Sequence, residues 1–65
     1  MQVVINGQDT SIEDGKSVAD LVESLDLHGK IAVEINRGIV PRSQFKNHVI
    51  QEGDVIEIVQ AIGGG

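Results

Sequence analysis

The sequence predicts an α+β fold, a roll in which one helix packs across a mixed sheet of four to five strands. The chain has 65 residues, enough for one small domain and too few for two. Several stretches alternate apolar and polar residues as strands do, whereas only one has the spacing of an amphipathic helix. Because a single helix covers only one face of one sheet, we expect a single domain over residues 1–62, with the element order ββαβ(β)β.

The first two strands, over residues 1–6 and 8–13, are predicted to form a hairpin. Apolar and polar residues alternate through the first of them, and Asn6-Gly7 follows. Both turn residues tolerate the positive φ that a type I′ turn requires, so this dipeptide favours a tight two-residue connection.

A helix is predicted over about residues 18–26. Its apolar positions recur at the spacing i, i+3, i+4, i+7: Val18, Leu21, Val22 and Leu25. Ser17 is the predicted N-cap, with Asp20 three residues later as an acidic capping box, and Gly29 is the predicted C′ residue. Both ends of the helix are therefore specified locally.

The next two strands are predicted to be joined by a turn, and the second of them is predicted to be short. Alternation predicts a strand over 31–36, which ends in the turn Asn36-Arg37-Gly38, and a short partner strand at Ile39-Val40. Pro41 has no backbone donor, so the partner strand is expected to lie at an edge or to stop there. The segment 42–49 is predicted to be irregular.

The final strand is predicted over residues 55–62, after a turn at Glu52-Gly53-Asp54. Alternation places Ile56 and Ile58 toward the helix, with Glu57, Val59 and Ala61 on the opposite face. Because this strand is the most apolar, we expect it to be central and to pair with the first strand.

Charge and composition disfavour a nucleic-acid partner and a membrane partner. The formal net charge is −5 and Phe45 is the only aromatic residue, whereas nucleic-acid binding needs clustered cations and aromatic platforms. The five basic residues are scattered: Lys16, Lys30, Arg37, Arg42 and Lys46. A basic protein surface is the expected partner. No apolar run approaches the roughly 20 residues of a membrane helix, so a cytoplasmic location is expected.

No catalytic or metal site is predicted within the domain. His28 and His48 are isolated from one another, and a zinc site needs three or four convergent ligands. Four carboxylates lie beside turn glycines and are interpreted as solvated turn residues: Glu13, Asp14, Glu52 and Asp54. The glycine spacing matches no phosphate loop, so ATP is expected to bind a partner instead.

A surface at the end of the final strand is predicted to bind a partner protein. It consists of Glu57, Val59, Ala61 and Ile62, because outward apolar residues on a one-helix roll are candidates for burial in an interface. The alternative is ordinary strand composition, since isolated surface apolar residues are common.

The carboxyl-terminal residues Gly63, Gly64 and Gly65 carry the predicted chemistry. Three residues without side chains are expected to form a flexible tail that places the terminal carboxylate where a bulkier chain could not reach. That carboxylate is ionised and unreactive at pH 7, so it needs ATP-dependent activation by a separate enzyme. Because the chain has no cysteine, a cysteine nucleophile and a persulfide are excluded, and any covalent chemistry needs another group.

The sequence resembles the ThiS family of sulfur carriers in thiamine thiazole biosynthesis. The likeness covers the whole chain and includes three features: the segment Ile39-Val40-Pro41-Arg42-Ser43, the segment from Glu52 to Val59, and the terminal Gly-Gly-Gly. The Gly-Gly end is shared with ubiquitin and with the molybdopterin synthase small subunit. The Val-Pro-Arg segment and the chain length favour ThiS.

The resemblance implies a ubiquitin-like β-grasp fold and a carrier that is not itself an enzyme and binds no cofactor. Gly65 would be adenylated by a ThiF-type enzyme that uses ATP and magnesium, with Gly63 and Gly64 threaded into that partner. A sulfur donor enzyme would supply the sulfur, and the resulting thiocarboxylate would deliver it to thiazole synthase. Three alternatives stay open: a ubiquitin-like modifier, a carrier for another sulfur-containing product of the molybdopterin type, and an interaction module with an inert tail.

Overall fold

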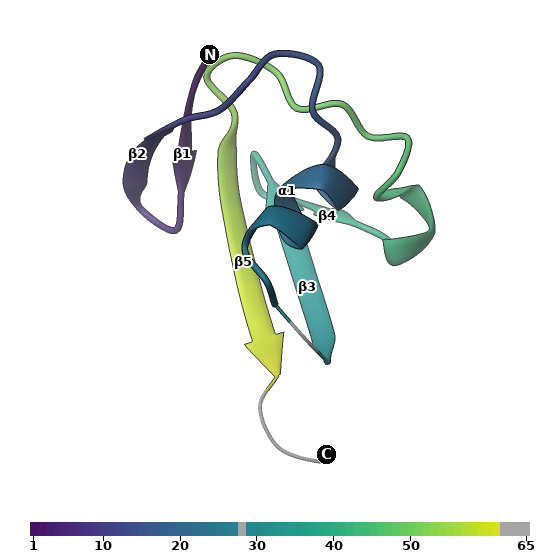
Figure 1. Ribbon diagram of the computed structural model, residues 1–65. Coiled ribbons are helices and arrows are strands. Elements are labelled where there is room, and N and C mark those ends of the chain that lie inside the picture. The colour runs from purple at the N-terminus through teal and green to yellow at the C-terminus, as the bar shows by residue number, and fades with distance from the viewer. Residues whose placement is uncertain (28, 62–65) are drawn as a thin grey trace.

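The computed structural model describes residues 1–27 and 29–61, which form a five-stranded sheet and two helical segments (Figure 1). The elements are β1 (Gln2–Ile5), β2 (Gln8–Ser11), α1 (Val18–Ser24), β3 (Lys30–Ile35), β4 (Gly38–Val40), a 3₁₀ helix η1 (Arg42–Gln44) and β5 (Val55–Ala61). The predicted element order is confirmed, and the segment predicted to be irregular contains η1.

The strands lie in the order β2-β1-β5-β3-β4, so β5 is central (Figure 1). It runs parallel to β1 and antiparallel to β3, whereas β1 with β2 and β3 with β4 form antiparallel hairpins. The predicted central position of the last strand and its pairing with the first are therefore confirmed. β4 is an edge strand that ends at Val40, immediately before Pro41, as the missing backbone donor requires.

The core lies between the sheet and α1. Ile56 and Ile58 face inward as predicted, with exposed fractions of 0% and 8%. The segment between β4 and β5 contributes Phe45 and Ile50 to the same core. The carbonyl oxygens of Phe45 and His48 also accept the first helical N–H groups, from Ala19 and Val18, at 2.9 Å each. This segment therefore satisfies donors that a helix N-terminus leaves unpaired.

Both hairpin turns have positive φ at their two central residues. Asn6 and Gly7 have φ of 49° and 81°, which confirms the predicted type I′ geometry. In the β3–β4 turn the corresponding residues are Asn36 at 53° and Arg37 at 73°. Gly38 is not a central residue of this turn, since it pairs with Ile35.

The predicted N-terminus of the helix is confirmed. The Ser17 hydroxyl accepts a hydrogen bond from the Asp20 N–H at 3.1 Å, and the Asp20 carboxylate accepts one from the Ser17 N–H at 3.0 Å. These hydrogen bonds to Ser17 hold the pKa of Asp20 below its ordinary value, because they favour the charged carboxylate.

The predicted C-terminus of the helix is wrong. The helix ends at Ser24 and not near residue 26, with Leu25 as the C-cap, so Asp26, with φ of 55°, is the C′ residue. Gly29 also has positive φ, 84°, but it lies three residues beyond the C′ position. An aspartate tolerates positive φ better than most residues, which allows the earlier stop. Because Leu25 is already the C-cap, it is 42% exposed and does not extend the buried face of the helix.

The interpretation of Asp54 as a solvated turn residue is also wrong. Its side chain is buried and accepts hydrogen bonds from the Gln51 N–H at 2.9 Å and from Asn36 Nδ2 at 3.0 Å. The carboxylate thus folds back onto its own turn and joins it to the β3–β4 turn. His48 is half-buried, and His28 lies outside the described residues.

Candidate functional site: the open sheet face beside the carboxyl-terminal segment

The face of the sheet opposite α1, here called the open face, carries the outward residues of β5. Glu57 and Ala61 are exposed, Val59 is 65% exposed and Val55 is 48% exposed. The predicted outward orientation of Glu57, Val59 and Ala61 is therefore confirmed, while their role in binding a partner stays a prediction. Ile62, the fourth residue of that predicted surface, lies outside the described residues.

The register of β3 against β5 adds residues to the open face that the sequence did not identify. Lys30 lies opposite Ala61, Ala32 opposite Val59, and Glu34 opposite Glu57. On the next strand Ile39 lies opposite Glu34 and is 78% exposed. Alternation within each strand assigns these side chains to one of two faces, but only the pairing shows that they share a face with β5.

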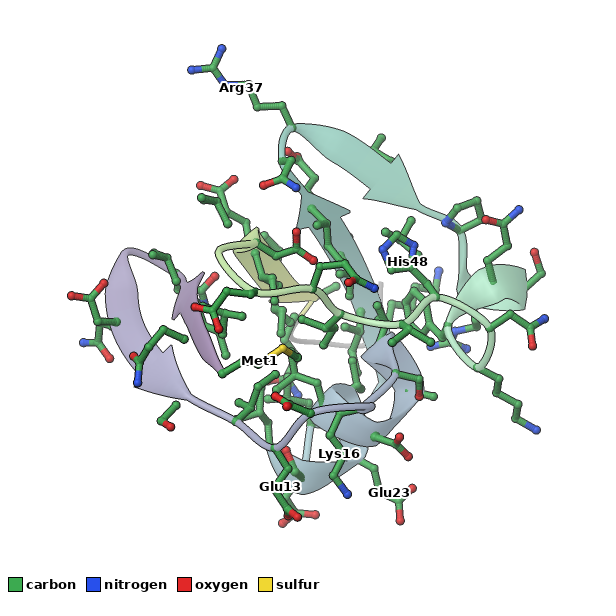
Figure 2. The ribbon with its side chains drawn as sticks, turned by 90° about the horizontal axis from the view of Figure 1, so that it is seen from above. Met1, Glu13, Lys16, Glu23, Arg37 and His48 are labelled. Atoms are coloured by element: carbon green, nitrogen blue, oxygen red, sulfur yellow. The ribbon has the colours of Figure 1, made fainter. Side chains whose placement is uncertain are left out.

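The open face has a hollow near the β3–β4 turn. It is lined by Glu34, Asn36, Arg37, Val55 and Glu57. Arg37 projects away from the fold at this turn, whereas Glu13, Lys16 and Glu23 lie at the opposite side of the molecule (Figure 2). The hollow is therefore lined by two carboxylates on adjacent strands, one guanidinium, one amide and the apolar side chain of Val55.

Two asparagine side chains hold β5 in place. Asn6 Oδ1 accepts a hydrogen bond from the Ile58 N–H at 2.8 Å, and Asn6 Nδ2 donates one to the Ile58 carbonyl at 3.3 Å. Because β1 ends at Ile5, the Asn6 amide continues its hydrogen bonding to β5 by one further residue. On the other side of β5, Asn36 Oδ1 accepts from the Val55 N–H at 3.0 Å. The strand that carries the open face is thus fixed from both neighbouring turns.

The end of β5 that leads into the carboxyl-terminal segment lies beside two cations. Lys30 is the β-ladder partner of Ala61. Arg42, in η1, donates a hydrogen bond from Nη2 to the carbonyl of Gly29 at 3.2 Å. A Cβ at Gly29 would stand 3.7 Å from the Ala61 carbonyl oxygen, so this loop contacts the last described residue of the strand. The candidates Gly63, Gly64 and Gly65 follow from here and lie outside the described residues.

Within residues 1–27 and 29–61, no group of three or more histidine, cysteine, aspartate or glutamate side chains could hold a metal ion. No helix in this part of the chain is long and apolar enough to cross a membrane. The buried side-chain nitrogen and oxygen atoms of the same residues all have hydrogen-bond partners. The described residues thus bring apolar and charged side chains together on the open face.

The amino-acid sequence is similar to a known protein family and to several proteins of known name. The model of the ThiS family matches residues 3–65. The sulfur carrier protein ThiS of Escherichia coli (strain K12) is 41% identical over 66 positions, which cover all of both chains. A thiazole synthase of Paramagnetospirillum magneticum is 39% identical over 66 positions, which cover all of this chain but only 20% of that enzyme.

A solved structure shows the same fold. The crystal structure of the thiamine biosynthesis protein ThiS from Geobacter metallireducens has a TM-score of 0.84 and 25% sequence identity, over the full length of both chains. With the mixed five-stranded sheet and one α-helix, this likeness confirms the ubiquitin-like β-grasp fold expected from the sequence.

Proposed function

The chain belongs to the ThiS family of sulfur carrier proteins in thiamine biosynthesis, and on this premise we propose that it carries sulfur as a thiocarboxylate on Gly65. As a member of this family it is a carrier protein and not a catalyst. The observation that carries the proposal is the family match, which extends through residue 65. The absence of cysteine supports it, because a carboxyl group is then the available covalent attachment point for activated sulfur.

The proposed chemistry has three steps. An oxygen of the Gly65 carboxylate attacks the α-phosphorus of ATP, and pyrophosphate leaves to give an acyl-adenylate. Sulfide supplied by a donor enzyme then attacks the acyl carbon, and AMP leaves to give the thiocarboxylate. The thiocarboxylate sulfur finally attacks an electrophilic carbon of the thiazole precursor, and hydrolysis of the acyl–sulfur bond releases the carrier with its carboxylate restored. Activation is needed because an ionised carboxylate does not react with nucleophiles at neutral pH.

We propose three partners for these steps. A ThiF-type adenylating enzyme supplies the site for ATP and magnesium, a sulfur donor enzyme supplies the sulfur, and thiazole synthase accepts it. The thiazole synthase partnership is supported by the enzyme of Paramagnetospirillum magneticum, a fifth of which is similar to this chain. The other two partners follow from the chemistry, because nucleotide activation and sulfur donation need groups that the described residues do not offer.

The open face is the proposed docking surface for the adenylating enzyme. Glu57, Val59 and Ala61 lie on it, and Ile62 is the next residue along the chain. The segment Gly63 to Gly65 is proposed to enter the enzyme, because a chain without side chains fits a narrow channel.

Two assays test the proposal. ATP–pyrophosphate exchange with the adenylating enzyme reports the acyl-adenylate, and intact mass after addition of ATP and a sulfur source reports exchange of one oxygen for sulfur. Deleting Gly65 retracts the carboxylate by about 3.3–3.6 Å, and a displacement of 1 Å already lowers rates on the order of a hundredfold. The shortened chain should therefore bind the enzyme and fail to be adenylated.

Two further variants distinguish the effect of the terminal carboxylate on adenylation from the effect of side-chain bulk in the segment. A chain that ends in the Gly65 carboxamide has the natural length, but an amide nitrogen replaces one oxygen of the nucleophilic carboxylate, so it should bind without exchange. Gly64→Leu keeps the carboxylate and adds bulk, so it should block exchange while the melting temperature stays that of the natural chain. Exchange at the natural rate with all three chains would exclude Gly65 as the reactive residue. Amide-linked conjugates in place of a thiocarboxylate would favour a ubiquitin-like modifier.

A further inference from the structure

The open face has an ordered arrangement of charge along the strands. At the end of β5 near the carboxyl-terminal segment, Lys30 lies beside Ala61; next come Ala32 and Val59; and then Glu34 lies opposite Glu57. Alternate residues of a strand are spaced by about 6.6 Å, so the cation and the paired carboxylates are separated by about 13 Å along β3. A partner surface that docks here must therefore be complementary to a positive charge at one end, apolar side chains in the middle and two negative charges at the other end.

The pairing of Glu34 with Glu57 is unfavourable within the isolated domain. Side chains directly opposite on adjacent antiparallel strands have their Cβ atoms about 4.5–5.5 Å apart, and like charges at this spacing are destabilising. Neither carboxylate has an ion pair in the part of the chain that the structure describes, where the one ion pair joins the Met1 ammonium to Asp14 at 3.4 Å. The domain thus retains a repulsion that a bound cation would relieve.

A guanidinium fits this position better than an ammonium. Two carboxylates on neighbouring strands present several acceptor oxygens to one point, and arginine presents five donors in a planar fork. Apolar side chains lie beside the two carboxylates on the open face, with Val55 at 48%, Val59 at 65% and Ile39 at 78% exposure, and the hollow is also lined by Asn36 and Arg37 of the β3–β4 turn. Burial of these side chains would remove water from around the charges and strengthen the hydrogen bonds between them.

The length of the carboxyl-terminal segment keeps the end of β5, and with it the Lys30 end of the open face, near the enzyme that acts on Gly65. Four residues follow Ala61, and each extends at most about 3.3–3.6 Å, so the terminal carboxylate is within about 14 Å of the end of β5. The adenylating enzyme must therefore approach Lys30 closely while it holds the segment. A carboxylate of the enzyme beside Lys30 would complement its charge at the mouth of the channel.

We propose that the adenylating enzyme binds the open face by placing one arginine guanidinium between Glu34 and Glu57 and a carboxylate against Lys30. This inference rests on the proposed function, since it describes the partner that activates Gly65. The opposite charges at the two ends of the contact fix the direction in which the domain docks. They therefore direct the carboxyl-terminal segment into the enzyme and disfavour the reversed orientation.

The test measures the dissociation constant of the full chain and the adenylating enzyme by titration calorimetry. Glu34→Gln and Glu57→Gln should each raise Kd about tenfold, because each removes one charge-assisted partner of the guanidinium. Lys30→Gln should raise it about two- to fivefold, as expected for a more exposed pair. Glu23→Gln and Lys16→Gln are matched controls, since they make the same charge changes on the far side of the molecule (Figure 2) and should leave Kd unchanged.

The double variant of Glu34 and Glu57 tests whether one guanidinium is shared. Two independent contacts would multiply to about a hundredfold, whereas a shared contact should give no more than about 20-fold, because the second carboxylate loses its partner with the first. Each single variant should also raise the melting temperature, by about 1–4 °C, since it removes the repulsion between the strands. Weaker binding together with a more stable fold excludes unfolding as the cause.

The outcomes distinguish this inference from the proposed function. A Kd that is indifferent to Glu34→Gln and Glu57→Gln, or changed equally by the controls, would overturn the docking proposal. If Gly65 still gains sulfur at saturating enzyme concentration in that case, the proposed function stands without it. If the natural chain binds as described here and gains no sulfur, the proposed function falls and the docking contact remains.

Discussion

Asn6 offers a sharp test of how β5 is held, because its side chain replaces a stretch of strand. The amide pairs with both the N–H and the carbonyl of Ile58, at 2.8 Å and 3.3 Å, from a backbone conformation with φ of 49°. Asn6→Ala removes both hydrogen bonds and leaves a partly buried N–H unpaired, which costs about 1–3 kcal/mol. Alanine in the left-handed conformation adds about 1 kcal/mol. The expected loss in the free energy of unfolding is thus about 2–4 kcal/mol.

That loss is a large share of the total stability. A domain of this length has about 3–10 kcal/mol at the usual stability per residue. Urea denaturation followed by circular dichroism measures the change, and amide hydrogen exchange at Ile58 shows whether the strand opens there. Asn6→Gly separates the two causes, because glycine accepts the positive φ and still lacks the amide, so it should lose about 1 kcal/mol less than Asn6→Ala.

Asn47→Ala is the matched control for Asn6→Ala. Asn47 is exposed, and the structure shows only its backbone N–H in a hydrogen bond, to the Gln44 carbonyl at 3.1 Å. Its substitution should change the free energy of unfolding by less than about 0.5 kcal/mol. If Asn6→Ala were as neutral as this control, the side chain would not be fixing β5 and the argument would be refuted.

Three further predictions concern the core, the helix and the docking rate. Ile58→Ala should lower the free energy of unfolding by about 2–5 kcal/mol in urea denaturation, whereas its exposed neighbour Val59→Ala should lower it by less than about 1 kcal/mol. Because its hydrogen bonds to Ser17 lower the pKa of Asp20 in the folded state, this carboxylate stabilises the fold above its ordinary pKa and stops doing so as the pH falls through the lowered value. Asp20→Asn should therefore reduce the loss of stability on acidification, as measured by melting temperature against pH. Rising ionic strength should slow association with the adenylating enzyme, and Glu57→Lys should slow it further, in stopped-flow measurements of the on-rate.

Local chemistry made the turns and the helix start predictable from the sequence. Asn6-Gly7 needs only two residues to specify a type I′ turn, and Ser17 with Asp20 needs only four to specify a capping box. These features depend on neighbours along the chain, so the structure confirmed them. The end of the helix was misjudged because both Asp26 and Gly29 have positive φ, and the helix stops before the first of them, at a residue type less typical of a C′ position than glycine.

The remaining features required three-dimensional contacts. Asp54 was misjudged because its partner Asn36 lies 18 residues away in the sequence, on another turn. Glu34 and Lys30 were missed as members of the site because alternation assigns a residue to a face of its own strand and not to a register with another. Asn6 was recognised as a turn residue, but its second role needs Ile58, which lies 52 residues further along.

The open face and the carboxyl-terminal glycines differ in how well they can distinguish one partner enzyme from another. Residues without side chains provide a backbone and a carboxylate, which any enzyme of the proposed kind could accept, so the segment alone discriminates weakly between partners. The open face carries the side chains that differ in charge and size, and its Ala61 end lies within about 14 Å of the proposed reacting group. On the docking proposal, discrimination between an adenylating enzyme and a sulfur acceptor comes from contacts such as those of Glu34, Glu57 and Lys30. Substitutions there should change which enzyme binds, while the chemistry available to Gly65 stays the same.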